Sequence, residues 1–342
     1  MFTNSSVEIA PELKGLLKDS VSTDMAVAYA ATQKLQAALS VINSGVLHGD
    51  TISGIFNMQK FEPGQEIKYP LDIVGPSDVK HHIAYTVPDT GYIPQRTVEG
   101  DEMVIRTYRI ATSIDWSREL ARQSRWDIVA RAMAVADAGV VRKRNNDGWH
   151  TIITAAVDRG ISISDTSIAS GLFGKRLVAL AQTVMRRNAG GNSTSVDRGR
   201  LTHIAMSPES LQDVRSWDLT MVDEITRHEI FVAADTYSLT KIFGVTLVDL
   251  DEFGEGQEYQ KYYNNTLGAS NPNSKSEIAI GLDLAYQPEA TFVMPWVAQD
   301  NGQFFQMYED PTLIRLGRKG YHGEGRFGTA VLQSRVVIIL GI

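Results

Sequence analysis

Residues 118–158 read RELARQSRWDIVARAMAVADAGVVRKRNNDGWHTIITAAVD and carry the strongest helical pattern in the chain. Apolar residues recur in this stretch at spacings of three and four, the period of one face of an α-helix. They are Trp126, Val129, Met133, Ala136 and Val140. A continuous helix would be about 60 Å long at ~1.5 Å per residue, too long for a small domain to enclose. We expect it to lie along a surface or to form a spine.

Two features of this stretch predict a bend or break in the helix. Gly139 lies near its middle, and glycine in a helix costs roughly 1 kcal/mol relative to alanine. The cluster Asn145-Asn146-Asp147-Gly148 follows. We therefore expect the spine to bend or break at one of these two places.

Basic residues outnumber acidic ones along the predicted helix. One interpretation is that they form ion pairs with neighbouring elements. The other is that they form a surface for non-specific, salt-sensitive contacts with DNA. The residues predicted to face DNA are Arg118, Arg122, Arg125, Arg142, Lys143 and Arg144.

The region before the helix has a different character. Five prolines lie between residues 63 and 94, among β-prone runs at 52–56, 66–71, 82–87 and 103–110. Prolines at this density exclude long helices and favour a two-stranded ribbon with free edges. Because an isolated ribbon is marginally stable in water, we expect it to lie on a neighbouring copy. The predicted interface residues are Phe61, Lys68, Tyr69, Tyr85, Arg96 and Glu99.

The first 45 residues favour two helices. A short one covers about 12–19, and a longer one follows Thr23-Asp24 and ends at Asn43-Ser44-Gly45, a typical helix stop. The apolar face of this stretch needs a partner. It either packs on another subunit as an arm or packs on its own domain.

Beyond the long helix, strand and helix patterns mix without regular βαβ alternation, which favours an α+β fold. We predict helices over about 174–187 and from Ser207-Pro208 to 216, and strands over 201–206 and 245–250. Residues 253–273, rich in glycine and asparagine, are predicted to be a loop. The predicted C-terminal strands are 290–297, 304–307, 312–316, 327–332 and 336–340.

Composition narrows the classes of protein. With 342 residues, the chain is long enough for about two compact units, and it contains no cysteine, so disulfides, thiolate zinc sites and cysteine nucleophiles are excluded. The net charge of −7 disfavours a sequence-specific nucleic-acid binder. The N-terminus lacks a signal-peptide pattern, and no run of about 18 apolar residues predicts a membrane span. We expect synthesis in the cytosol and no membrane partner.

Catalytic motifs are absent from the sequence, so no enzyme, catalytic residue, cofactor or metal site is predicted. The run 171–176 ends in Gly-Lys-Arg, but Ala169 and Arg176 stand where a phosphate-binding loop needs glycine and Ser or Thr. The seven histidines lack ligand spacing. The acidic run 249–256 does not follow the calcium-hand pattern, which leaves a solvated loop or an ion held between subunits.

The order of these elements resembles the major capsid proteins of tailed phages, the Hong Kong ninety-seven type of shell fold. Local stretches from about His48 onward are similar to one branch of that family. They are Pro94-Gln95-Arg96, Val98-Glu99-Gly100, Tyr108-Arg109-Ile110, Asp115-Trp116, Arg125-Trp126-Asp127, Asn146-Asp147-Gly148-Trp149-His150, Met185-Arg186-Arg187-Asn188, Ser207-Pro208-Glu209 and Phe292-Val293-Met294-Pro295.

The resemblance implies four parts: an N-terminal helical arm, an extended β-ribbon called the E-loop, a peripheral domain that contains the spine helix, and an axial domain. Their expected limits are 1–47 for the arm, 48–108 for the E-loop, 109–160 with 299–330 for the peripheral domain, and 161–298 with 331–342 for the axial domain.

It further implies self-assembly as hexamers and pentamers into an icosahedral virion head, built in the host bacterial cytoplasm around double-stranded DNA. The implied partners are other copies, a separate scaffolding protein, a portal and cement proteins. Some family members crosslink subunits through lysine and asparagine. Nothing positions an acceptor for Lys60 or Lys68, so no crosslink is predicted.

Two alternatives remain open from the sequence. A bacterial encapsulated compartment uses the same fold, and its particle would contain cargo protein instead of DNA. A cytosolic oligomeric enzyme with an exposed β-arm would form small discrete oligomers and would need a pocket with titratable groups.

Overall fold

The computed structural model describes residues 50–70, 102–117, 119, 126–165, 167, 172–188, 199–217, 241–268, 277–285, 291–300 and 302–342. The predicted arm at 1–47 and the ribbon runs between 71 and 101 therefore lie outside the described residues. Described residues within 50–67, 104–147 and 294–329 form one compact unit, and those within 68–70, 102–103, 148–293 and 330–342 form a second.

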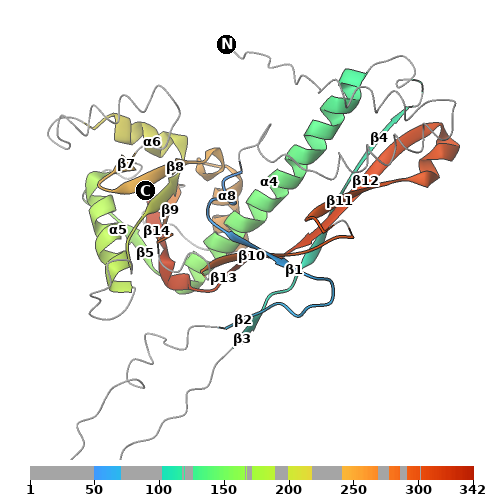
Figure 1. Ribbon diagram of the computed structural model, residues 1–342. Coiled ribbons are helices and arrows are strands. Elements are labelled where there is room, and N and C mark those ends of the chain that lie inside the picture. Colours follow the sequence, from blue (N-terminus) through green and yellow to red (C-terminus); the bar gives the residue numbers. More distant parts are fainter. Residues whose placement is uncertain are drawn as a thin grey trace, which may run out of the picture. The chain divides into compact units, whose positions relative to one another are not determined.

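The described strands are β1 (Asn57–Phe61), β2 (Lys68–Pro70), β3 (Glu102–Val104), β4 (Tyr108–Ser117), β5 (Ser162–Ser164), β6 (His203–Met206), β7 (Lys241–Ile242), β8 (Val245–Asp249), β9 (Ile278–Leu282), β10 (Phe292–Val297), β11 (Phe305–Glu309), β12 (Arg318–Phe327), β13 (Ala330–Val331) and β14 (Val337–Gly341). The described helices are α4 (Trp126–Arg159), α5 (Lys175–Asn188), α6 (Pro208–Arg215) and the short α8 (Glu258–Lys261). The mixture of sheets and helices is α+β, as the sequence predicts (Figure 1).

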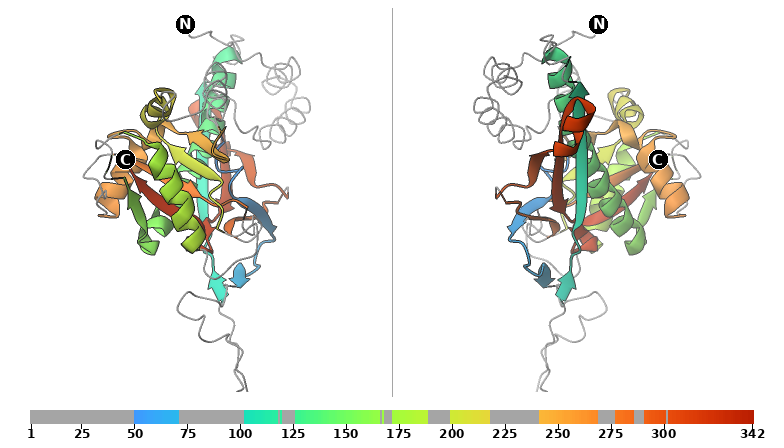
Figure 2. Two further views of the ribbon diagram at one scale, coloured as in Figure 1. Left: turned by 90° about the vertical axis from the view of Figure 1, so that its left-hand side faces the viewer. Right: turned by 90° about the vertical axis from the view of Figure 1, so that its right-hand side faces the viewer.

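A sheet with the order β1-β10-β12-β11 forms most of the first unit, with β4 paired to β12. The β4–β12 ladder is antiparallel and unbroken from Tyr108↔Phe327 to Ser117↔Arg318. These long strands lie side by side in Figure 2. Side chains alternate across the ladder, so Ile110, Ile114 and Trp116 are buried while their neighbours in β4 face outward.

α4 is continuous, so the predicted break is wrong. Gly139 is exposed and Gly148 is buried within an unbroken helix. Apolar burial explains the continuity, because it outweighs the roughly 1 kcal/mol cost of a helical glycine. Val140 and Val141 are buried in the first unit, and Trp149 is buried in the second.

The second unit is built around a sheet with the order β5-β14-β9-β6-β8-β7. All five residues of β9 and of β14 are buried, which is typical of strands covered on both faces. Helix α5 contributes Leu177, Val178 and Met185 to the same core. Its start at Lys175 and the start of α6 at Pro208 confirm two helix predictions. Ser207 caps α6 by accepting a hydrogen bond from the backbone N–H of Ser210.

Three local predictions are wrong. Residues 52–56 form a turn and not a strand, because the backbone N–H groups of Ile55 and Phe56 donate to the Ile52 carbonyl. The predicted strand at 312–316 is a 3₁₀ helix over Pro311–Leu316. The predicted loop at 253–273 contains α8 and a π-helical turn at Tyr262–Thr266.

Aromatic packing explains why this predicted loop contains helical turns. Trp149 lies 5.5 Å from Phe253 and 6.3 Å from Tyr259, measured between ring centroids. Phe253, Tyr259 and Tyr263 are all buried. The loop prediction failed because the residues between these aromatic side chains are mostly polar or glycine, so the sequence showed no regular apolar pattern.

Candidate subunit-contact and nucleic-acid-facing surfaces

The structure describes the base of the predicted ribbon, which consists of β2 and β3. β2 and β3 form a sheet of their own, and the Lys68 ammonium lies 3.9 Å from a carboxylate oxygen of Glu102. Lys68 is exposed, whereas Tyr69 is only 8% exposed. Burial raises the pKa of the Tyr69 phenol to about 12. Tyr69 is therefore packed inside its own chain, while Lys68 is accessible to a partner.

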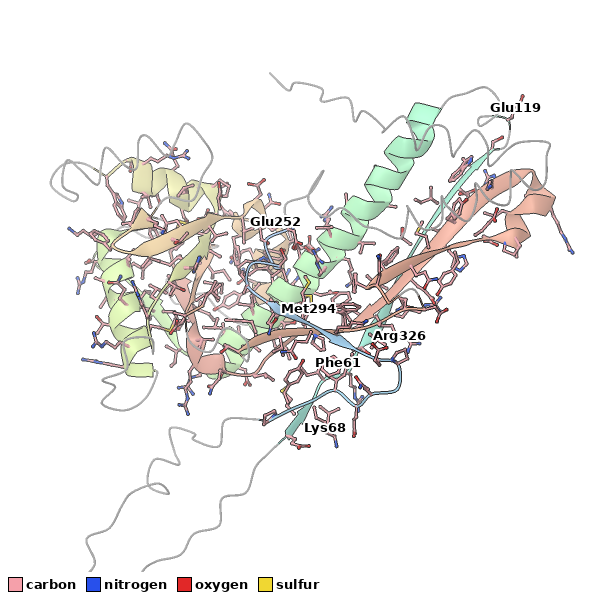
Figure 3. All side chains as sticks on the ribbon, viewed as in Figure 1. Phe61, Lys68, Glu119, Glu252, Met294 and Arg326 are labelled. Carbon is pink, nitrogen blue, oxygen red and sulfur yellow. The ribbon has the colours of Figure 1, made fainter. Side chains whose placement is uncertain are left out.

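Phe61 ends β1 in the first unit, and its carbonyl accepts a hydrogen bond from the Ala298 backbone N–H at 2.9 Å. The side chain is partly exposed (labelled in Figure 3). It is thus fixed by the backbone and open to a contact. The other three predicted interface residues, Tyr85, Arg96 and Glu99, lie outside the described residues.

Three of the predicted DNA-facing residues are described, and they have different environments. Arg142 is exposed. Lys143 is exposed and donates to Asp147 at 2.7 Å. Arg144 forms an ion pair with Asp50, and the two side chains are only 11% and 10% exposed. Arg118, Arg122 and Arg125 lie outside the described residues.

Asp50 anchors the chain at the start of the described region. Besides binding Arg144, its carboxylate accepts a hydrogen bond from the backbone N–H of Ser53 at 3.1 Å. The turn that follows buries Ile52 and Phe56 completely or nearly so. Residues 50–56 therefore form an anchor turn, which a charge pair fixes to α4 and which buries two apolar side chains.

Tyr108 links β4 to the same helix. Its hydroxyl donates to Asp147 at 2.7 Å, and its ring lies 4.8 Å from the Phe327 ring. Burial and the bond to Asp147 raise the pKa of the Tyr108 phenol. Lys143, Asp147 and Tyr108 thus form one network between helix and sheet.

The outward face of the β4–β12–β11 sheet carries alternating charges. Arg318 binds Asp115 at 2.7 Å, and Arg109 binds Glu324. Arg109 lies directly opposite Arg326 (labelled in Figure 3), so a like charge stands beside it. On the β11 side, the rings of Tyr308 and His322 stack at 5.5 Å.

The residues considered for metal or phosphate binding have structural contacts. Within the described ranges there is no group of three His, Cys, Asp or Glu side chains that could hold a metal ion. Burial and the nearby Asp251 raise the pKa of Asp249 in the acidic run. In the run 171–176, the backbone N–H of Phe173 donates to the Asp213 carboxylate at 2.9 Å. This hydrogen bond joins the run to α6.

The lone histidines pack against neighbours. His150 stacks on Tyr262 with ring centroids 4.0 Å apart. His203 has its Nδ1 atom 3.0 Å from the Thr202 hydroxyl, and burial followed by the charge of Lys241 lowers its pKa. Among the helices that the structure describes, none is long and apolar enough to cross a membrane.

Sequence reasoning missed Asp50, Arg109 and Asp115. Asp50 meets Arg144 across 94 positions of sequence, and no local pattern signals such a pair. The charges of β4 do have a local signal, since the buried Ile110, Ile114 and Trp116 are spaced by even numbers and Arg109 and Asp115 lie at the alternate positions. That signal was missed because the strand was predicted to end at residue 110.

The comparisons with known proteins identify the fold through solved structures and not through sequence. No protein-family model and no curated protein sequence matches the chain. A structure from Mycobacterium phage Ogopogo is 15% identical with a TM-score of 0.56, over 86% of this chain and 94% of that chain. The capsid structure of the cyanophage P-SCSP1u is 13% identical with a TM-score of 0.55, over 88% and 91%.

The mature capsid of bacteriophage PhiM1 is also similar, at 13% identity and a TM-score of 0.52, over 88% of this chain and 89% of that chain. These matches span most of both chains, although few residues are shared. The chain therefore has the fold of tailed-phage major capsid proteins, the Hong Kong ninety-seven type of shell fold.

Proposed function

We propose that the chain is the major capsid protein of a tailed phage and has a structural role, not a catalytic one. The supporting observation is the fold match, which covers between 86% and 88% of this chain and between 89% and 94% of the three matched chains. Two of those structures are described as phage capsids. Hexamers and pentamers of this chain would form an icosahedral head around double-stranded DNA.

The ribbon base supports contact between copies. In the part of the chain that the structure describes, β2 and β3 pair only with each other. A two-stranded sheet is marginally stable alone, so burial against another copy would stabilise it. We propose residues 48–108 as an E-loop and 1–47 as an arm, both lying on neighbours, with Phe61 and Lys68 in the contact. Tyr85, Arg96 and Glu99 remain proposed interface residues, and Tyr69 would support the ribbon from within.

The remaining parts follow the same proposal. Residues 109–160 with 299–330 would form the peripheral domain, and 161–298 with 331–342 the axial domain. A scaffolding protein, a portal and cement proteins are the further proposed partners.

For DNA contact, Arg142 and Lys143 are the described residues that we retain, because both are exposed on α4. Arg118, Arg122 and Arg125 remain proposals. For Arg144 we propose a structural role instead, because its guanidinium pairs with Asp50 and its side chain is only 11% exposed. Contacts from exposed cations would be non-specific and would weaken as salt concentration rises.

Electron microscopy of the purified protein, produced with and without a scaffolding protein, tests this function. Closed icosahedral shells, or rings of five and six subunits, are expected. Absorbance at 260 and 280 nm before and after nuclease treatment then separates a DNA-filled head from a compartment that holds protein cargo. Small oligomers that never assemble would contradict the proposal.

A further inference from the structure

The outer edge of β4 is unusually long and regular. β4 pairs with β12 over ten consecutive residues, and among the described residues no strand pairs with its other edge. Proteins usually protect such an edge with proline, a bulge or a short strand, because an open edge templates pairing with another chain. β4 contains no proline, and its ladder with β12 has no bulge. An edge of this kind can pair with another chain.

The sequence of β4 is complementary to itself when two copies run antiparallel. With Thr112 opposite Thr112 of the second copy, Arg109 lies opposite Asp115 and Ile110 opposite Ile114. Antiparallel pairing about a two-fold axis repeats each contact, so both Arg–Asp pairs form at once. Ala111 then lies opposite Ser113, two small side chains that fit a close approach.

This register also keeps both faces of the sheet consistent. Side chains directly opposite each other in a ladder point to the same face. Arg109 and Asp115 are on the outward face, where they are 57% and 42% exposed. Ile110 and Ile114 are both on the buried face. A shift by one residue would place charged residues opposite buried ones.

The charges already present in each chain favour the same pairing. Arg318 binds Asp115 and Glu324 binds Arg109 within one copy. Across the two-fold axis the outward face would read Arg318, Asp115, Arg109, Glu324, in strictly alternating sign. Arg109 also gains a second carboxylate, which offsets its in-chain neighbour Arg326.

From this complementarity we propose that β4 pairs with β4 of a second copy, antiparallel and centred on Thr112, so that the two sheets become one continuous sheet. The inference rests on the proposed function, because it specifies one contact between copies in the shell. The β4–β4 contact is isologous, because the same surface of both copies takes part. The proposed contact of the ribbon with a neighbouring copy is heterologous, because it joins two different surfaces. Loss of one of these contacts therefore does not imply loss of the other.

A charge exchange tests the pairing. In R109D and in D115R, two like-charge pairs face each other at every two-fold axis, and we expect the yield of shells to fall about tenfold. R109D/D115R restores opposite charges across the axis and should recover shells to within about twofold of the original chain. In-chain contacts cannot explain such recovery. In the double variant, the aspartate introduced at position 109 would still face Glu324, and the arginine introduced at position 115 would still face Arg318.

A disulfide tests the register without relying on yield. The chain contains no cysteine, so any disulfide must come from an introduced residue. Assembled and oxidised T112C shells should yield covalent dimers on a non-reducing gel, since opposed residues have Cβ atoms roughly 5 Å apart. S117C is the matched control, because in this register the two Ser117 positions are about 30 Å apart.

The outcomes separate the two proposals. Shells of the original chain that form normally, with no T112C dimer and no recovery in the double variant, would overturn the β4 pairing and leave the capsid function intact. That result would instead indicate that another segment covers the edge. Failure of the original chain to form shells would contradict the proposed function on which the pairing rests.

Discussion

At the scale of single residues, the anchor turn depends on a charge pair that is removed from solvent. D50A leaves the Arg144 guanidinium without its carboxylate, and an unpaired buried charge costs several kcal/mol. We expect the free energy of unfolding to fall by about 3 kcal/mol in a urea titration. D50A/R144M should recover most of that loss, because a methionine carries no charge to bury.

K143A is the matched control for this prediction. Lys143 is the preceding residue of α4 and also binds a carboxylate, but its side chain is 56% exposed. An exposed pair of this kind contributes about 0.5 kcal/mol or less. Equal losses in D50A and K143A would contradict the assignment of Asp50–Arg144 as a structural clamp.

Tyr69 provides a residue-scale prediction of pH dependence. Burial raises its pKa to about 12 in the folded chain, above the ~10 of an unfolded tyrosine. Its contribution to stability is therefore fully present below pH ~10 and is lost as the pH rises through about 12. Y69F removes the ionisable group, so its stability should decline less between these pH values. Identical alkaline unfolding curves for the two proteins would show that Tyr69 is not buried as described.

At the scale of elements, the close packing of β12 against β11 requires glycine at position 323. A Cβ atom at Gly323 would collide with the ring of Phe305 and the sulfur of Met307. G323A should therefore lower the free energy of unfolding by about 1–3 kcal/mol, the usual cost of overpacking.

G139A should act in the opposite direction. Gly139 is exposed in the middle of α4, and a Cβ atom there meets nothing within 4 Å. Alanine should raise the free energy of unfolding by up to about 1 kcal/mol through helix propensity. Thermal unfolding of the two variants beside the original chain measures both effects, and a stabilised G323A would contradict the packing of β12 on β11.

The elements also show what sequence alone could and could not predict. Helices α5 and α6 were predictable from apolar periodicity and from the cap at Ser207. β12 was not, because Gly320, Gly323 and Gly325 conceal a strand that tolerates no side chain at those positions. The strand needs glycine because residues outside β12 pack against these three positions in the folded chain. The local sequence pattern of β12 does not reveal those contacts.

At the scale of the whole molecule, the order of elements carried the functional inference more than any motif. A proline-rich ribbon before a long helix, followed by mixed strands, predicted the shell fold, and the structural matches confirm that fold. The candidate surfaces were less predictable. Arg144 was grouped with the DNA-facing residues because a charge pattern does not reveal burial, and its partner Asp50 is distant in sequence.

Cryo-electron microscopy of particles formed by this chain tests the central claim most directly. The capsid account predicts closed icosahedral shells in which rings of five and six copies form the wall and the two compact units fit each subunit's density. Discrete dimers or tetramers, even when a scaffolding protein is supplied, would contradict it.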